Sequence, residues 1–331
     1  MLSSLFGSDP SANQRRWQRS PRNPVIRPEG TGWADDFIAA CTVVEHDGAL
    51  RLYAEGSVDG HEQIGLFHGA GDPSEADWAP DSGNPVVRVG SGHDRGGVFD
   101  PAVVRFRDHW LLYYSATEGD AHAFAELLET EQGQPGQGEG GPTDETIGLA
   151  VSDDGLTFSK HPDSPVLAAR CPFAVVHEDK VHLFYVKISD GGYRVHLATS
   201  DDGVRFVEEP AGRPVLDVGP AGSWDGYTVT TPKVFRDGDR WCMSFAGDGK
   251  RLDDPTGIGL AFSEDLYSWE KLPGNPVFSV GDAGSFDSVS VASPIIRRHG
   301  DRYLMWYAGS DRAIRDGLHS QVGLAWISAA Q

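Results

Sequence analysis

The feature that most constrains the fold of this chain is an internal repeat. Residues 222–247, GSWDGYTVTTPKVFRDGDRWCMSFAG, align almost position for position with residues 281–309, GDAGSFDSVSVASPIIRRHGDRYLMWYAG. Both segments begin with a small residue, an aromatic residue and Asp, continue into an apolar stretch that contains Pro, and return in a second apolar stretch after a Gly-Asp turn. Self-similarity of this kind is typical of architectures in which every copy forms the same supersecondary unit.

Three fainter copies precede these two, at residues 33–56, 92–116 and 170–187. A matching tail follows most copies, made of an apolar stretch, an aromatic residue and a Pro-Val pair. The Pro-Val pairs stand at residues 85–86, 165–166, 214–215 and 276–277. Short runs rich in Val, Tyr, Phe and Trp, bounded by Gly, Asp and Pro, indicate β-strands. One repeat is therefore predicted to be four short strands.

Four strands per repeat, at a spacing of roughly 50 to 70 residues, are typical of a β-propeller blade. The five copies predict an all-β, five-bladed β-propeller with four-stranded antiparallel blades. The last copy ends one strand short at residues 324–327, while the N-terminus supplies an extra tail at residues 17–25. We therefore predict that the N-terminal strand closes the last blade, which removes an unpaired sheet edge. Residues 17–331 would form this single domain, after a loose N-terminal arm at residues 1–16.

Composition narrows the class of protein further. An apolar fraction of 39% with nine Trp is enough for a buried core, and the net charge of −21 argues against nucleic acid and anionic membranes as partners. No run approaches the roughly eighteen apolar residues of a membrane helix, and the first ten residues do not resemble a secretory signal. We expect a cytoplasmic protein whose cysteines, Cys41, Cys171 and Cys242, are buried small hydrophobic residues. No metal-site spacing or phosphate-binding Gly loop is present, so we expect no metal and no cofactor.

Long connections point to one edge of the propeller as the functional one. Residues 118–145 include the low-complexity stretch GQPGQGEGG and lie between the second and third strands of blade two. The same connection is extended in blade four, at residues 248–256, and in blade five, at residues 310–321. Long loops on an ordered scaffold commonly carry binding sites.

The propeller geometry selects candidate site residues at that edge. The innermost strand of each blade lines the axis, and the start of that strand lies beside the end of its antiparallel neighbour. Residues that lead into the Pro position are Asp35, Asp36, Asp94, Asp100, Arg170, Asp225, Tyr227, Thr231, Asp287 and Ser293. The ends of the second strands add Glu55, Glu118, Lys187, Asp248 and Asp311. Several carboxylates around one funnel are what acid–base or nucleophilic chemistry on a glycosidic bond requires.

Repetition separates structural candidates from functional ones. Asp94, Asp225 and Asp287 occupy one repeat position, which favours a structural role in capping a turn or bracing the next blade. Asp100 has no carboxylate at its equivalent positions, so the repeat does not explain it and we favour a functional role. We align it with Ala40, Cys171, Thr231 and Ser293.

Two further residues leave alternatives open. Asp36 also lacks a carboxylate counterpart, and is either functional or a solvated turn residue. Arg170 replaces Phe99 and Thr230 of other copies. An Arg in a mouth lined by carboxylates either braces an Asp or binds an anionic group of a substrate.

The repeat, with Phe99-Asp100-Pro101 and the later SWD and SFD motifs, resembles the five-bladed propeller glycosidases. This group comprises glycoside hydrolase families 43, 32 and 68, with the family 130 mannoside phosphorylases and family 117 as relatives. The resemblance covers residues 17–328 and implies three catalytic carboxylates: a blade-one Asp as base or nucleophile, a blade-two Asp that orients the site, and a blade-three Glu as acid. Asp100 matches the blade-two Asp. The blade-one position is Ala40, which leaves Asp36 or Asp35, and the blade-three position is Arg170.

Three functions follow from this partial match. The first is a glycosidase acting on a small saccharide, with Asp36 as base, Asp100 as orienting group, and Glu118 or Asp225 (or Glu55, or a water) supplying the missing acid. The second is a related transfer such as phosphorolysis, with inorganic phosphate bound by Arg170 and Lys187. The third is a sugar-binding propeller that has lost catalysis. Asp35, Glu55, Asp94, Tyr227 and Asp287 would contact the saccharide in each case. The fold does not decide among them, because function belongs to the site.

Overall fold

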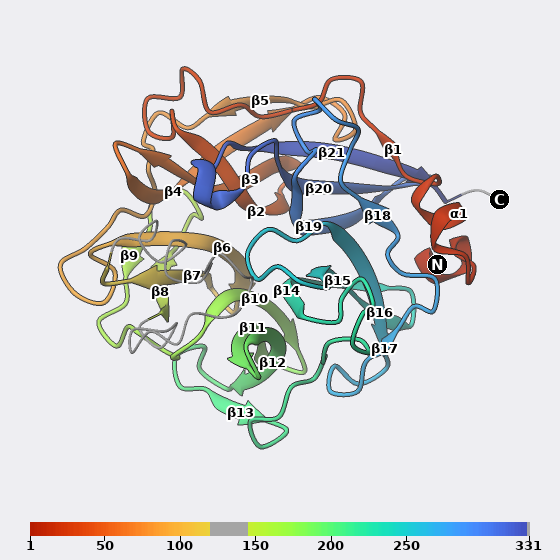
Figure 1. Cartoon of the computed structure of the whole chain (residues 1–331). Helices are drawn as coiled ribbons and strands as arrows, with labels where there is room; N and C mark the ends of the chain where they lie inside the picture. The colour runs from red at the N-terminus through yellow and green to blue at the C-terminus, as the bar shows by residue number, and fades with distance from the viewer. Residues whose placement is uncertain (120–144, 330–331) are drawn as a thin grey trace.

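The computed structural model describes residues 1–119 and 145–329, and nearly all of its regular structure is β-sheet (Figure 1). The exceptions among these residues are three short helices: η1 (Leu2–Leu5), α1 (Pro10–Gln14) and η3 (Ile314–Asp316). No helix in this part of the chain is long and apolar enough to cross a membrane. The predicted all-β class is thus confirmed.

The strands follow one another in five antiparallel groups. The first group is β2 (Phe37–His46), β3 (Ala49–Val58), β4 (His61–Ala70) and β5 (Asp77–Pro80). The second is β6 (Gly97–Phe106), β7 (His109–Thr117), β8 (Thr146–Ser152) and β9 (Ser159–Lys160). The third is β10 (Arg170–His177), β11 (Lys180–Ser189), β12 (Gly192–Ser200) and β13 (Val207–Glu209). The fourth is β14 (Thr228–Asp237), β15 (Arg240–Asp248), β16 (Gly257–Ser263), β17 (Glu270–Lys271) and β18 (Phe278–Ser279). The fifth is β19 (Ser290–His299), β20 (Arg302–Ser310), β21 (Ser320–Ser328) and β1 (Gln18–Arg19).

The groups are arranged around a common centre (Figure 1). A single parallel pair, Glu62 with Gly97, joins the first two groups, so backbone pairing gives four sheets rather than five. The first strands of the groups contact one another in succession, and β19 also contacts β2. The N-terminal strand β1 pairs with β21 at the edge of the last sheet, which is the place that the sequence predicts for it.

A bulge interrupts every first strand at the same place. The register with the second strand skips two residues after Ile38, Phe99, Arg170, Thr230 and Ala292. In four groups the first bulged residue has a φ of +46° to +51°, a left-handed conformation that is uncommon for residues other than glycine. These four residues are Asp100, Cys171, Thr231 and Ser293. A bulge of this kind re-aims a side chain and is frequent beside functional sites.

The register corrects the repeat alignment in the first group. Ile38 pairs with Gly56 and Cys41 with Ala54, just as Phe99 pairs with Ser115 and Ala102 with Tyr113. The counterpart of Asp100 is therefore Ala39, and Ala40 stands where the other copies have Pro. The sequence alignment was one residue out because this copy lacks the Pro that marks the bulge elsewhere.

The N-terminal arm, residues 1–16, is packed against the sheets rather than loose. Leu2 and Leu5 are buried, and the backbone N–H of Leu2 donates to Asp237 Oδ2 at 2.6 Å. The buried Asn13 side chain donates to the carbonyl of Gly274 at 2.9 Å. Leu2 and Leu5 pack in one cluster with Trp17, so apolar contacts and these hydrogen bonds together hold the arm in place.

Candidate functional site

A cavity of about 120 Å³ opens at the end of the axis where the first strands begin. Its walls combine the bulges of the first strands with the long connections of groups four and five, as the sequence predicts for those two loops. Its charged lining residues, among those described, are Glu55, Asp100, Arg170, Asp253 and Asp254. Most of the other lining residues have small side chains, and Pro255, Ile314 and Leu318 complete the wall. The small ones are Ala39, Ala40, Cys171, Thr230, Thr231, Ser290, Ala292, Ser293, Ala308 and Ser320.

Asp100 is fixed by contacts with three different strand groups. Its Oδ2 atom accepts a hydrogen bond from the Ser115 hydroxyl at 2.9 Å and from the Cys171 thiol at 3.2 Å. Its backbone N–H donates to Glu55 Oε2 at 2.8 Å. Burial and the neighbouring charge of Asp100 raise the pKa of the Cys171 thiol well above its usual value, so the thiol keeps the proton that it donates. The side chain of Asp100 is thus held as an acceptor at the cavity wall.

Glu55 is the acidic partner of Asp100 in the cavity wall. The side chain is buried, and burial raises its pKa well above the ordinary glutamate value. The charges of Asp100 and Glu62 raise the pKa further, while the N–H of Asp100 and the charge of Arg170 oppose the rise. The environment of Glu55 thus favours its protonated form, beside the Asp100 carboxyl group that accepts hydrogen bonds from Ser115 and Cys171. Two acids in contrasting environments are the arrangement that general acid–base catalysis uses.

Arg170 is the centre of a second polar network. It forms ion pairs with Glu145 (Nε to Oε2, 3.3 Å) and Asp253 (Nη1 to Oδ1, 3.2 Å) and donates to the Tyr193 hydroxyl. That hydroxyl donates in turn to Asp253 at 3.1 Å. Burial raises the pKa of Glu145 to about 7 although the charge of Arg170 lowers it. Of the two roles open to Arg170, bracing carboxylates is the one that this geometry gives it.

Sequence reasoning missed Glu145, Tyr193 and Asp253. Glu145 directly precedes β8 at the end of the predicted insertion, and Asp253 lies in the 248–256 connection, from which only Asp248 was selected. The signal was present, because both residues stand in the connections that were expected to carry the site. The remaining part of the insertion, residues 120–144, lies outside the described residues.

Four predicted candidates lie away from the cavity on solvent-exposed turns or strand ends. Asp36 is exposed and accepts a hydrogen bond from the Ser57 hydroxyl at 3.1 Å. Asp35 is exposed and accepts the N–H of Gly32 at 2.9 Å. The Glu118 carboxylate lies 3.5 Å from Arg95. The Asp311 carboxylate lies 2.8 Å from His319. None of the four carboxylates is among the described residues that line the cavity.

Asp94, Asp225 and Asp287 form the same brace in three groups. Each accepts an ion pair from a cation on the outer strand of its group: Lys160 in β9, Lys271 in β17 and Arg19 in β1. Tyr114 and Tyr307 also donate to Asp94 and Asp287, at 3.2 Å and 2.9 Å. The position of Asp225 thus fits the bracing role that repetition favoured, not that of an acid in the cavity.

Lys187 and Tyr227 are also directed elsewhere. The Lys187 ammonium pairs with Glu208, and the backbone carbonyl of Tyr227 accepts from Arg194 at 3.3 Å. Neither residue lines the cavity. The structure therefore does not bring Lys187 to Arg170, and the predicted phosphate site is not assembled. Within the described residues, no group of three or more His, Cys, Asp or Glu side chains is placed to hold a metal ion.

The chain was compared with protein-family models, with curated proteins and with solved structures. No protein-family model matches the chain. The uncharacterized proteins MT1551 and Rv1502 of two Mycobacterium tuberculosis strains are each 27% identical to it over 256 residues, covering 74% of this chain and 78% of each relative.

Solved structures with a similar fold include enzymes that act on carbohydrates. A thermostable family-43 glycoside hydrolase matches with a TM-score of 0.60 and 18% identity, over 88% of this chain and 91% of its own. A structure from the GH130 family of mannoside phosphorylases matches with a TM-score of 0.65 and 16% identity, over 95% and 94%. An N-acetylgalactosamine deacetylase from F. plautii, in complex with blood group B trisaccharide, matches with a TM-score of 0.66 and 16% identity, over 95% and 96%. The resemblance predicted from the sequence is confirmed at the level of the fold.

Proposed function

We propose that the chain is a closed five-bladed β-propeller enzyme that hydrolyses a glycosidic bond of a small saccharide. The observation that carries this proposal is the pair of Glu55 and Asp100 in the wall of one cavity, where burial raises the pKa of Glu55 well above its usual value and Asp100 accepts hydrogen bonds. Similarity in fold to glycoside hydrolases supports it. Because Asp36 is exposed and Asp225 is a brace, we assign the base to Asp100, which the sequence analysis made the orienting group, and the acid to Glu55, which it gave as an alternative acid.

Each member of the pair has one task in the proposed reaction. Glu55 donates its proton to the oxygen of the leaving sugar as the bond from that oxygen to the anomeric carbon breaks. Asp100 takes a proton from a water, whose oxygen forms the new bond to the anomeric carbon. The products are two free hydroxyl-bearing sugars. Asp100 then releases its proton and Glu55 regains one through solvent, which restores the starting state.

The size of the cavity favours a terminal sugar as the reacting unit. A volume of about 120 Å³ corresponds to about four water molecules at roughly 30 Å³ each. Sites for whole drug-sized ligands are larger, roughly 300–1,000 Å³. The described residues therefore enclose the reacting end of a saccharide, and the rest of it would lie over the loops at the rim.

The proposal is tested by the turnover of nitrophenyl glycosides and of unactivated disaccharides. Asp100→Asn should lower kcat by on the order of 10²–10⁴ on both substrates, since it removes the proton acceptor. Glu55→Gln should lose far more activity on disaccharides than on nitrophenyl glycosides, because nitrophenolate leaves without an acid. The exposed Asp35→Asn is the matched control and should keep the wild-type rate. Full activity of Asp100→Asn would contradict the proposal.

A second candidate, a sugar-binding protein without catalysis, is favoured by one observation. Arg170 occupies the position where the resemblance implies the acid, and its charge is taken up by Glu145 and Asp253. Saccharide binding in calorimetry without turnover of any substrate would favour this candidate. Phosphorolysis has less support because Lys187 is paired with Glu208, so adding inorganic phosphate should not change the rate.

A further inference from the structure

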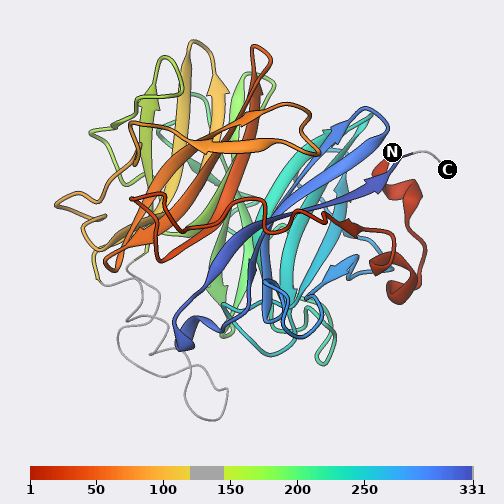
Figure 2. The ribbon, with the colours of Figure 1, turned by 90° about the horizontal axis from the view of Figure 1, so that it is seen from above.

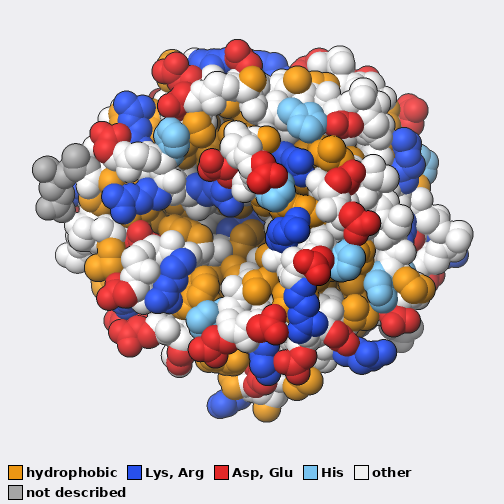
Figure 3. Space-filling model, turned by 180° about the vertical axis from the view of Figure 1, so that it is seen from behind, with side chains coloured by type: hydrophobic (Ala, Val, Ile, Leu, Met, Phe, Trp, Pro, Cys, Tyr) orange, Lys and Arg blue, Asp and Glu red, His pale blue; other side chains and the backbone are white. Residues whose placement is uncertain are grey.

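A second and larger cavity, of about 490 Å³, opens at the opposite end of the axis. The centre of the face seen from behind is hollowed, with Lys and Arg side chains around the opening (Figure 3). The cavity is lined by the later halves of the same first strands β2, β6, β10, β14 and β19. Its walls are largely Val, Ile and Phe side chains, so its interior is apolar. We call it the back cavity, and the cavity around Asp100 the front cavity.

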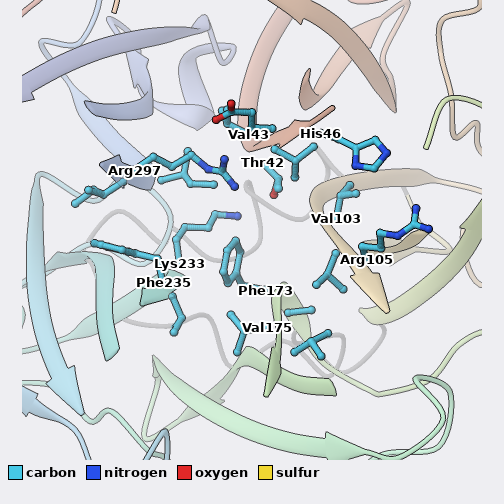
Figure 4. Close-up of a pocket in the computed structure, with 18 of the residues that line it drawn as sticks. Thr42, Val43, His46, Val103, Arg105, Phe173, Val175, Lys233, Phe235 and Arg297 are labelled. Carbon is cyan, nitrogen blue, oxygen red and sulfur yellow. The ribbon is translucent and has the colours of Figure 1, made fainter. Parts of the chain in front are cut away.

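Lys233 stands in the back cavity without an ion-pair partner among the described residues. The residue is 3% exposed, and its side chain points into the cavity (Figure 4). No hydrogen bond or ion pair joins its ammonium group to another described residue, and its contact there is the ring of Phe173, 5.2 Å from Nζ to the centroid. Burial lowers the pKa of Lys233, with the charges of Asp100 and Cys41 opposing the shift. An ammonium group buried without a partner is costly, so such a site favours an anion.

Arg297 is the second cation of the back cavity. Its guanidinium group is directed toward the same space as the Lys233 ammonium (Figure 4). Arg297 has no ion pair with another described residue, and burial lowers its pKa although the charge of Glu45 opposes the shift. A planar guanidinium beside an ammonium can hold two oxygens of one carboxylate or phosphate group.

The charged side chains of the back cavity are mainly cationic, whereas the whole chain is negatively charged. Of its described lining residues, Arg105, Lys233 and Arg297 are cationic and Glu45 alone is acidic, while the chain carries a net charge of −21. Arg105 lies at the exposed rim, 5.7 Å from the ring of Trp110. A concave, low-dielectric opening lined by one sign of charge attracts ions of the other sign.

We propose that the back cavity binds a small organic anion, with its carboxylate or phosphate group between Lys233 and Arg297 and its apolar body against the Val, Ile and Phe walls. The anion neutralises the buried ammonium group, and the walls bury the apolar part of the ligand. Neither the glycosidic chemistry proposed above nor the predicted phosphate pair uses these residues.

Isothermal titration calorimetry of the whole chain tests this site with octanoate as the probe. Octanamide serves as its neutral analogue, and inorganic phosphate as a charged group without an apolar body. Octanoate should bind at least tenfold more tightly than octanamide and than phosphate, because it alone uses both features of the cavity. Lys233→Met, which keeps an unbranched side chain one atom shorter, should weaken octanoate binding by on the order of tenfold or more, since it removes a buried charge partner.

Arg297→Gln provides an independent test on a half-buried side chain, in case Lys233→Met disturbs folding. It should weaken octanoate binding several-fold, whereas Arg298→Gln, on the neighbouring exposed residue of β19, should leave binding unchanged. Equal affinities for octanoate and octanamide, or no octanoate binding, would overturn the proposal. So would wild-type affinity in Lys233→Met or Arg297→Gln. Phosphate binding as tight as octanoate would overturn the role of the apolar walls.

Discussion

The front and back cavities are lined by the same first strands, yet they have opposite chemistry. Among the described residues, the front cavity has Glu55, Asp100, Asp253 and Asp254 with one cation, Arg170, in a wall of mostly small side chains. The back cavity has cations among large apolar side chains. The bulge between them marks the change, because Asp100 and Val103, three residues apart on β6, belong to different cavities. A strand that shifts its register at one point can therefore serve two sites.

The two cavities also differ in how their charges are satisfied. In the front cavity Asp100, Glu55 and Arg170 have hydrogen-bond or ion-pair partners within the protein. In the back cavity the Lys233 ammonium has no such partner among the described residues. A network that is satisfied before a ligand arrives holds reacting groups in place. An unsatisfied charge instead makes the binding of an opposite charge favourable.

Removing Arg170 should have the largest effect on stability. Arg170→Met leaves Glu145 and Asp253 buried without their cation, so the free energy of unfolding should fall by about 3–5 kcal/mol. Denaturant unfolding at pH 7.5 measures this. Arg205→Met, which breaks an exposed pair with Asp202, is the control and should change stability by less than about 1 kcal/mol. Equal effects of the two variants would show that Arg170 does not stabilise the buried Glu145 and Asp253 side chains.

Stability should fall as the pH rises through the range in which Glu145 titrates. Burial raises its pKa from 4.5 to about 7, so the unfolded chain loses this proton first and gains stability relative to the folded one. The effect is absent below pH 4.5, complete above about pH 7, and on the order of 3 kcal/mol. Glu145→Gln should flatten this part of the stability curve in denaturant unfolding. An unchanged curve in the variant would refute the assignment.

The back cavity should respond to the loss of its cation in the opposite direction. Lys233→Met removes a buried unpaired charge, so without ligand the variant should be more stable than wild type by roughly 1–2 kcal/mol at pH 6. Because the folded-state pKa of Lys233 is lowered, the gain should shrink as the pH rises toward about 10.4, where the unfolded lysine also loses its proton. Unfolding at pH 6 and pH 10 tests this. A variant less stable than wild type at both pH values would show that the ammonium is satisfied within the protein.

The smallest effect is expected on kcat when Asp36, the base predicted from the sequence, is replaced. Asp36 is exposed and outside the front cavity, so Asp36→Asn should keep kcat within about twofold of wild type, as surface changes usually do. Turnover of nitrophenyl glycosides by this variant and by Asp100→Asn gives the comparison. A large loss of kcat in Asp36→Asn would indicate that Asp36 takes part in the reaction.

Sequence reasoning reached the front cavity through two rules. Asp100 was selected because no other repeat has a carboxylate at its position, and Glu55 because the end of a second strand lies beside the start of the first. Both line the cavity. The same reasoning wrongly placed Asp36 and Lys187 in the cavity. The position of a residue along a strand does not tell whether its side chain points to the propeller axis or to a neighbouring turn or strand.

The repeat by itself determined the all-β class, the order of the strands, and the addition of the N-terminal strand to the last sheet. These follow from local patterns of apolar residues and turns, which the chain carries in each copy. Only the tertiary structure decided which charges meet: Glu145 with Arg170, Cys171 with Asp100, and Lys233 with no partner among the described residues. Such pairs join residues from different repeats, and their pKa values depend on burial, which no local pattern specifies.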